Sequence, residues 1–166
     1  HNLIKKIQPD YIFHLAAQSF PKASFQMPNT TFDVNINGTY DLLDAQRIYG
    51  KKNTKIHVCS SSEVFGRVRK ENLPIDENCS FHPASPYAIS KIGTDLIGRH
   101  FAEAYSMNVQ VTRMFTHTGP RRGDYFAEST FAKQIAMIES EVINPIIKVG
   151  NLKSLRTFAD VRDAVE

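Results

Sequence analysis

Short apolar runs alternate with segments of helical periodicity along this sequence, and this alternation limits the possible fold more than any other feature. The apolar runs that we expect to be strands are residues 11–17, 54–60, 109–115, 145–150 and 154–158. The segments that we expect to be helices are residues 28–49, 86–105, 127–140 and 159–165. The apolar runs show little alternation of polar and apolar residues, which is typical of strands in a parallel sheet. We therefore predict an α/β fold whose parallel sheet is covered by helices on both faces.

Composition and charge exclude several classes of protein. The 166 residues suffice for one domain, and their hydrophobic content of 42% is ordinary for a globular protein. The net charge of +3 comes from scattered basic residues, so we expect no nucleic-acid partner. No apolar run approaches the roughly 20 residues that span a bilayer, so we expect no membrane contact. Neither the histidines nor Cys59 and Cys79 have a metal-binding spacing, so we expect no metal and two reduced thiols in a cytoplasmic protein.

Polar residues follow three of the expected strands at the point where each strand ends. The sequence AAQS follows the first strand, SSSE the second, and THTGPRR the third. Open α/β sheets bind their ligands at the carboxyl edge of the strands. We therefore expect the three clusters to form one site.

Tyr87 and Lys91 are candidate catalytic residues at the start of the helix expected over residues 86–105. Their spacing of four places them on one helix face. A nearby ammonium favours the phenolate and lowers a tyrosine pKa from its ordinary value of about 10, so the pair could exchange a proton with a hydroxyl. Taken alone, the pair is better explained as an ordinary contact on a helix surface. Its position beside the SSSE cluster favours catalysis.

The cluster Ser61, Ser62 and Glu63 has two interpretations. A polar turn would use Ser61 or Ser62 to cap local backbone groups. A catalytic site would use a serine to bind a substrate oxygen beside Tyr87, with Glu63 as a further acid or base. Consecutive hydroxyls followed by a carboxylate exceed what a turn needs, so we favour the site. The sequence has no GxSxG motif for serine hydrolysis.

The ordered motifs HLAAQS, SSSEVFG, SPYAISK, TRMFTHTGPRRG and VGNLKSLRTFADVRDAV resemble those of the extended short-chain dehydrogenase/reductases that modify nucleotide sugars, the NAD-dependent epimerase/dehydratase family. The resemblance covers nearly the whole chain and is strongest to GDP-mannose 4,6-dehydratases. It implies a Rossmann-type doubly wound parallel sheet. By this resemblance, residues 1–126 are the catalytic part of the cofactor domain and residues 127–166 begin a substrate-binding region.

One expected motif of this family does not occur in the sequence. A glycine-rich loop would hold the cofactor pyrophosphate at a helix N-terminus, and no GxxGxxG pattern is present. We therefore interpret the sequence as a part of a longer polypeptide that lacks most of the substrate domain. We expect these residues alone to bind NADP poorly and to be inactive.

The resemblance also implies roles for individual residues. It makes Tyr87 the catalytic tyrosine, Lys91 a ligand of the nicotinamide ribose, Ser61 the active-site hydroxyl and Glu63 the base of a dehydratase. The residues implied to line the cofactor, NADP or alternatively NAD, are Leu15, Ala16, Ala17, Gln18, Ser19, Lys91, His117 and Arg122. The residues expected to contact the substrate are Ser62, Thr116 and Arg121. In addition, Arg121 and Arg122 could together clamp a phosphate, because guanidinium groups bind phosphates with two hydrogen bonds.

The implied reaction converts GDP-mannose or a related GDP-sugar to the 4-keto-6-deoxy sugar, with a hydride that leaves C4 and returns to C6. The alternatives are a GDP-4-keto-6-deoxy-mannose reductase, whose relatives can also carry a glutamate nearby, and a non-catalytic nucleotide-binding relative. Thr116 stands where dehydratases usually have asparagine, which leaves the sugar open, a GDP-heptose included. The resemblance further implies a homodimer or homotetramer formed through the helices expected over residues 28–49 and 86–105.

Overall fold

The computed structural model describes residues 2–153 and 155–166 of the chain. The chain divides into two compact units, His1–Met114 and Phe115–Glu166, and each is described by itself. The functional division that we expected after residue 126 stays a prediction.

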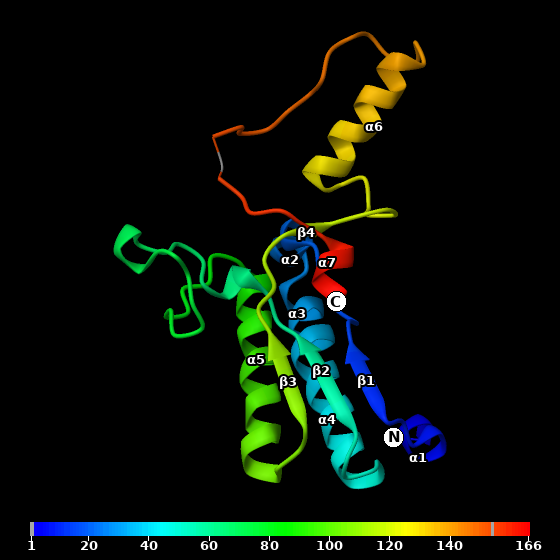
Figure 1. Ribbon diagram of the computed structural model, residues 1–166, viewed down its shortest axis with the longest axis vertical. Helices are drawn as coiled ribbons and strands as arrows, with labels where there is room; N and C mark the ends of the chain where they lie inside the picture. Colours follow the sequence, from blue (N-terminus) through cyan, green and yellow to red (C-terminus); the bar gives the residue numbers. More distant parts are fainter. Residues whose placement is uncertain (1, 154) are drawn as a thin grey trace. The chain divides into compact units, whose positions relative to one another are not determined.

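The first unit contains a parallel three-stranded sheet (Figure 1). Its strands are β1 (Tyr11–His14), β2 (Lys55–Cys59) and β3 (Val109–Thr112), in the order β1-β2-β3. In the register of the sheet, Ile56 pairs with Ile12 on one side and with Val109 on the other. The parallel α/β arrangement and the existence of these three strands are confirmed, although each strand is shorter than the apolar run that predicted it.

Two long helical segments follow the strands as predicted. The first runs without interruption through α3 (Pro28–Phe32), the π-helix η1 (Asp33–Asn37) and α4 (Gly38–Tyr49). The second is α5 (Pro86–Tyr105), with the predicted bounds. The sequence reasoning missed four short elements, which are α1 (Asn2–Ile7), α2 (Pro21–Gln26) and the 3-10 turns η2 (Ser62–Val64) and η3 (Lys70–Asn72).

Local sequence sets both ends of α5. The Ser85 hydroxyl accepts a hydrogen bond from the backbone N–H of Ala88 at 3.0 Å, and Pro86 occupies the first helical position. A serine cap followed by proline is a favourable start, because the cap pairs a free N–H and proline has none to lose. The helix ends at Ser106, whose φ of 53° is left-handed. These signals place the start of the helix, and with it Tyr87, next to the end of β2.

The core lies between the sheet and the helices α4 and α5. Leu43 of α4, Phe101 of α5 and the β2 residues Ile56 and Val58 are buried together. A Cβ at Gly98 would approach Val111 to 2.6 Å, so α5 packs against β3 at a distance that only glycine allows. This packing fixes the position of α5 against the carboxyl ends of the strands.

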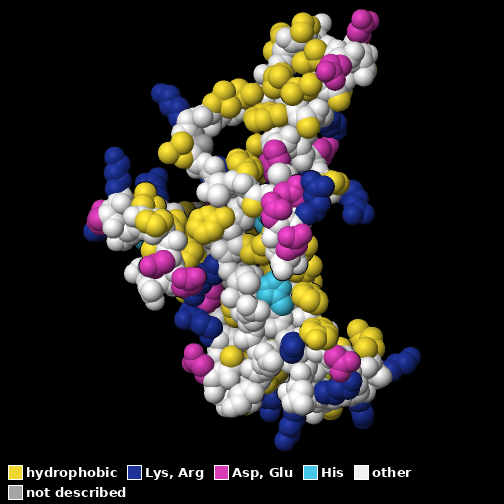
Figure 2. Space-filling view, viewed as in Figure 1, with side chains coloured by type: hydrophobic (Ala, Val, Ile, Leu, Met, Phe, Trp, Pro, Cys, Tyr) yellow, Lys and Arg dark blue, Asp and Glu magenta, His cyan; other side chains and the backbone are white. Residues whose placement is uncertain are grey.

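The opposite face of the sheet is not covered by helices within this unit. The β1 residues Tyr11 and Phe13 remain 59% and 67% exposed. Figure 2, viewed from the same side as Figure 1, shows hydrophobic and histidine side chains at the surface over the strands. The prediction of helices on both faces is therefore fulfilled on one face only in the described residues.

The second unit is built around two short parallel strands, β4 (His117–Thr118) and β5 (Ala159–Asp160). Helix α6 (Ala127–Glu139) confirms the predicted helix over residues 127–140, and α7 (Val161–Val165) begins two residues after the predicted start. The strands expected over residues 145–150 and 154–158 are wrong where the structure describes them, and Ser154 lies outside the described residues. In the described part of the chain, no helix has both the length and the apolar character needed to cross a bilayer.

Candidate active site

The end of β2 supplies the first group of candidate residues. Ser60 and Ser62 continue the sheet, since their backbone N–H groups donate to the carbonyls of Thr112 and Met114 at 2.8 and 3.0 Å. Ser61 is in extended conformation and caps the turn η2, with its hydroxyl accepting the N–H of Glu63 at 3.2 Å. The capping interpretation of Ser61 is thus correct, and it also fixes Glu63 one turn from the sheet.

Tyr87 lies in the first turn of α5 and meets this group. Its side chain is only 8% exposed, and its phenol lies close enough to the Ser61 hydroxyl for that hydroxyl to favour the phenolate and lower the tyrosine pKa. Its backbone N–H donates to the hydroxyl of Ser24, a fully buried residue of α2, at 3.0 Å. The structure therefore brings together Ser61 and Tyr87, as the motif order had suggested.

Lys91 is held one turn further along α5. Its Nζ donates to the carbonyl oxygen of Cys59 at 2.6 Å, and its own carbonyl accepts the Ser60 hydroxyl at 3.0 Å. The residue is only 6% exposed, and this burial lowers the pKa of its ammonium. Lys91 is consequently a fixed component at the end of β2 and not a mobile surface lysine, which excludes the surface-pair interpretation.

The electrostatics of Tyr87 differ from our expectation that Lys91 lowers its pKa. The pKa of Tyr87 is raised above its ordinary value, first because burial removes solvation of the phenolate. The hydrogen bond from Ser61 acts in the opposite direction, and the charge of Glu63 raises the pKa further. Lys91 is turned to the Cys59 carbonyl and does not outweigh these effects. With a pKa raised above its ordinary value, Tyr87 is a protonated phenol at neutral pH.

The segment after β1, where we expected cofactor contacts, is shaped by a buried asparagine of η1. The Asn35 Oδ1 accepts the backbone N–H of Gln18 at 2.8 Å, and its Nδ2 donates to the Gln18 carbonyl at 3.0 Å. This pair of bonds fixes Gln18, while Leu15, Ala16 and Ser19 are exposed. The exposed residues are available to a ligand at the carboxyl end of β1.

Asn35 also reaches α5, the helix that carries Tyr87 and Lys91, a link that the sequence reasoning missed. Its Nδ2 lies 2.8 Å from the Ser90 hydroxyl, which itself donates to the Tyr87 carbonyl at 2.7 Å. The Asn35 carbonyl accepts from Thr39, whose hydroxyl lies 3.0 Å from Nε2 of His14. Asn35 belongs to the π-helix η1, and π-helical turns are often found at functional sites. The available signal was a polar residue within the apolar stripe of the expected helix.

Replacing Asn35 by alanine should lower the free energy of unfolding by about 3 kcal/mol, because it leaves the N–H and carbonyl of Gln18 and the Ser90 hydroxyl without their partner. Urea unfolding of the full-length protein measures this loss. Asn37→Ala is the matched control, since Asn37 lies in the same π-helix, is exposed, and its side-chain amide donates to the exposed Asp33 carboxylate. Equal losses for both variants would contradict the role of Asn35.

The remaining predicted residues belong to the second unit. Arg122 donates to the His117 carbonyl at 2.7 Å, pairs with the carboxylate of Glu128 and stacks on Phe126. Arg121 is exposed with a left-handed φ of 70°, and the Thr116 carbonyl accepts the N–H of Ala159. The positive charge of Arg122 is thus compensated by the Glu128 carboxylate. The binding roles of His117, Arg122, Thr116 and Arg121 stay predictions.

The donor groups of the first unit fit one end of a nicotinamide cofactor. An ammonium carries three N–H donors, and among the described residues the Lys91 ammonium has the Cys59 carbonyl as its hydrogen-bond acceptor. Two donors are left, which is what the two hydroxyls of a ribose require. Among residues 2–153 and 155–166, no group of three or more His, Cys, Asp or Glu side chains could hold a metal ion.

Comparison with known proteins shows to which family the chain belongs. The family model described as GDP-mannose 4,6 dehydratase matches residues 1–166. The chain belongs to the GDP-mannose 4,6-dehydratase family. The resemblance inferred from the ordered motifs is therefore confirmed, and so is the Rossmann-type α/β fold class.

Two curated relatives and one solved structure define the position of the chain in this family. GDP-mannose 4,6-dehydratase of Yersinia enterocolitica is 37% identical over 98% of this chain and 43% of its own length. GDP-6-deoxy-D-mannose reductase of Pseudomonas aeruginosa is 34% identical over 95% of this chain and 51% of its own length. A structure of RMD from Pseudomonas aeruginosa, complexed with NADPH, superimposes with a TM-score of 0.91 and 33% identity, over 96% of this chain and 54% of that one. The chain thus spans about half the length of these family members.

Proposed function

We propose that the full-length protein carrying this sequence is a nucleotide-sugar 4,6-dehydratase. It would convert GDP-mannose or a related GDP-sugar to the 4-keto-6-deoxy sugar and recycle NADP within each turnover. The observation that carries this proposal is the placement of Ser61 and Glu63, in the cap and turn that follow β2, within electrostatic reach of the buried Tyr87 phenol of α5. A hydroxyl, a carboxylate and a phenol at one point are the groups that removal of one proton from the 4-hydroxyl and of one from the neighbouring carbon C5 requires.

Each residue has a separate task in this reaction. Tyr87, once it has lost its proton, would accept the proton of the sugar 4-hydroxyl as a phenolate, and Ser61 would hydrogen bond the same oxygen. Once C4 is a ketone, the C5 proton is acidic, and Glu63 would take it and return it to the departing 6-hydroxyl as water leaves. The bound cofactor would supply the acceptor from which the C4 hydride is returned to C6. The proton that Tyr87 took from the 4-hydroxyl would then go to C5, so that Tyr87 and Glu63 both end as they began. Lys91 would hold the ribose of that cofactor through its two remaining N–H donors.

The reductase of this family is the second candidate function. It is supported by the similarity to the Pseudomonas aeruginosa reductase, which is almost as high as that to the dehydratases. A reductase needs Tyr87 only as a proton donor to the ketone oxygen. The raised pKa of Tyr87 suits that role, whereas a reductase would not need Glu63 as a base.

Incubation of the full-length protein with GDP-mannose and a catalytic amount of NADP distinguishes the two functions. The dehydratase forms the 4-keto-6-deoxy sugar without net consumption of cofactor. If no product forms, but NADPH is oxidised when the 4-keto-6-deoxy sugar is supplied, the reductase is correct. Absence of both reactions would support the non-catalytic relative.

The GDP-sugar itself, the location in the cytoplasm and the assembly into a homodimer or homotetramer belong to the same proposal. Exposed apolar residues on α4 and α5 support assembly through these helices, among them Tyr40, Ile89 and Leu96. The sedimentation mass of the sample used for the assay decides the assembly state, and a monomer would contradict this part.

A further inference from the structure

Asp95 is a fully buried carboxylate of α5 that lies apart from the residues described above. Two guanidinium groups compensate its charge. Arg113 contributes two hydrogen bonds, from Nε to Oδ2 at 2.7 Å and from Nη2 to Oδ1 at 3.1 Å. Arg99 contributes an ion pair at 2.9 Å. The Arg113 side chain is 15% exposed and that of Arg99 is 46% exposed, so Arg113 is the interior partner.

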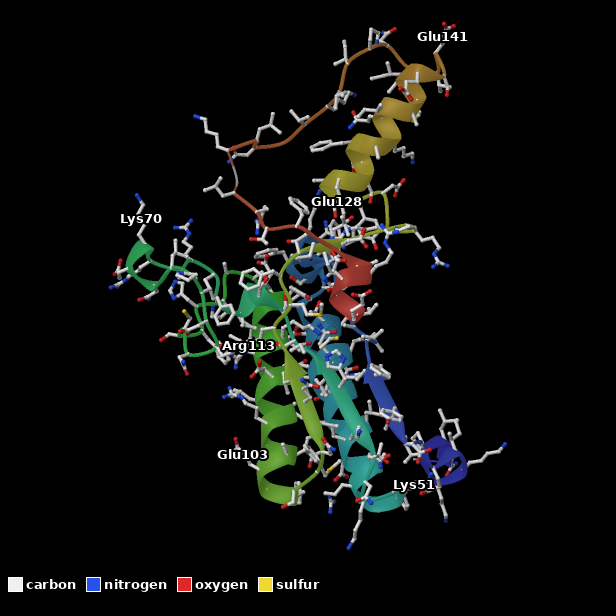
Figure 3. The ribbon with its side chains drawn as sticks, in the orientation of Figure 1. Lys51, Lys70, Glu103, Arg113, Glu128 and Glu141 are labelled. Atoms are coloured by element: carbon white, nitrogen blue, oxygen red, sulfur yellow. The ribbon has the colours of Figure 1, made fainter. Side chains whose placement is uncertain are left out.

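Arg113 uses its remaining groups on the segment of residues 64–85. Its Nη1 donates to the Glu77 carbonyl at 2.8 Å, and its guanidinium lies 5.6 Å from the ring centre of Phe65 and 4.8 Å from that of Phe81. The rings of Phe65 and Phe81 are 6.4 Å apart. In Figure 3, Arg113 lies where this segment joins α5 and β3, while the part around Lys70 extends away from them. Arg113 therefore contacts the segment near both of its ends, at Phe65 and at Phe81, while it is bound to the buried Asp95.

The segment connects the two catalytic elements directly. It leaves the turn η2 after Glu63 and enters α5 two residues before Tyr87. Its ends lie against each other, because the N–H of His82 donates to the Val64 carbonyl at 2.9 Å. Gly66 has a φ of 53°, and a Cβ there would meet the His82 carbonyl oxygen at 1.7 Å. A shift of either end would move Glu63 relative to Tyr87.

We propose that Arg113 is a positioning residue of this active site, which holds Glu63 in place relative to Tyr87 by fastening the segment of residues 64–85 to Asp95 of α5. Nothing else among the described contacts joins Asp95, Phe65, Phe81 and the Glu77 carbonyl at once. A guanidinium suits the task because its planar fork binds a carboxylate with two bonds and still stacks on aromatic rings. Lysine at this position would keep the positive charge but could neither bind the carboxylate with a planar pair of hydrogen bonds nor stack on the rings.

The test compares Arg113→Lys with the wild-type full-length protein. Because a misplacement of about 1 Å can cost about 10²-fold in rate, we expect kcat to fall by about 10–100-fold with KM within about threefold. Backbone hydrogen exchange supplies a second measurement. We expect exchange about tenfold faster at the amides of Gly66 and His82, and unchanged within about twofold at Ser60, which pairs with β3.

Two further variants make the outcome decisive. Arg99 shares Asp95 and lies 5.8 Å from the ring centre of Phe81, but it is 46% exposed and has no bond to the Glu77 carbonyl, so Arg99→Lys should lower kcat by no more than about threefold. Phe81→Leu removes part of the stack without touching Asp95 and should reproduce a smaller loss of kcat, which decides the question if Arg113→Lys does not fold. Equal losses for the Arg99 and Arg113 variants, or an unchanged kcat in Arg113→Lys, would overturn the proposal.

The prediction for kcat of Arg113→Lys rests on the proposed function, whereas the prediction for its backbone hydrogen exchange does not. If the wild-type protein forms no 4-keto sugar, the dehydratase proposal fails by itself. The kinetic comparison then uses reduction of the keto sugar, which also needs Tyr87. If neither reaction occurs, unchanged exchange at Gly66 and His82 still overturns the role of Arg113, and faster exchange at those two amides alone supports it.

Discussion

Tyr87→Phe is expected to slow formation of the 4-keto-6-deoxy sugar by about 10²–10⁴-fold, the range that loss of a general acid or base typically produces. The phenol is the proton-exchanging group that we assign to the sugar 4-hydroxyl, and its pKa responds to both Ser61 and Glu63. Phenylalanine fills the same buried space. The free energy of unfolding should therefore change by only about 1 kcal/mol, the contribution of one hydrogen bond. Product formation and urea unfolding, measured on one sample of the full-length protein, check both statements.

Tyr105→Phe is the matched control for this substitution. Tyr105 ends the same helix, is 46% exposed and contacts Arg47 through its ring. Its loss of a hydroxyl should leave the rate within about twofold of the wild type. A Tyr87→Phe variant that retains more than about a tenth of the rate would exclude the phenol as the group that exchanges the proton.

Helix α5 and the meeting of the strand ends could be predicted from the sequence. Ser85 and Pro86 mark the start of α5, and the parallel arrangement brings the ends of β1, β2 and β3 to one edge. These signals are local, or they follow from the topology of an open sheet. That is why the placement of Ser61 beside Tyr87 could be expected before the fold was known.

The apolar run over residues 145–150 shows where the same reasoning fails. Ile146, Ile147 and Val149 are apolar, yet all three are exposed and the segment forms no strand. A strand needs a neighbour to pair with, and an apolar run does not tell whether one is present. The prediction used composition where the outcome depended on a partner.

The properties of Tyr87 and the role of Asn35 could not be predicted because both depend on burial. A Tyr–Lys spacing indicates proximity, but the raised pKa of Tyr87 comes first from lost solvation. Asn35 is buried by a π-helical turn that shifts the faces of the following helix, and no periodicity of 3.6 residues anticipates that shift. In both cases the deciding quantity is the three-dimensional environment of one side chain.

Glu63→Gln is expected to separate the two halves of the proposed reaction. Glutamine keeps the shape of the side chain but cannot accept the C5 proton, so product formation should fall by about 10²–10⁴-fold. Removal of the 4-hydroxyl proton needs Tyr87 and not Glu63, so NADPH absorbance should rise by up to one equivalent per active site without product. Tyr87→Phe should give neither signal. A single turnover of GDP-mannose with stoichiometric NADP measures both quantities.

The pH dependence of that single turnover tests the electrostatic link between the two residues. Because the charge of Glu63 raises the pKa of Tyr87, its removal lowers that pKa, and the phenolate forms at lower pH. The rise of NADPH formation with pH should therefore occur at lower pH in Glu63→Gln than in the wild type. Glu71→Gln, in the exposed turn η3, should leave both the rate and the pH profile unchanged. An unshifted profile in Glu63→Gln would contradict the link, and product formation within about tenfold of the wild type would assign the C5 proton to another base.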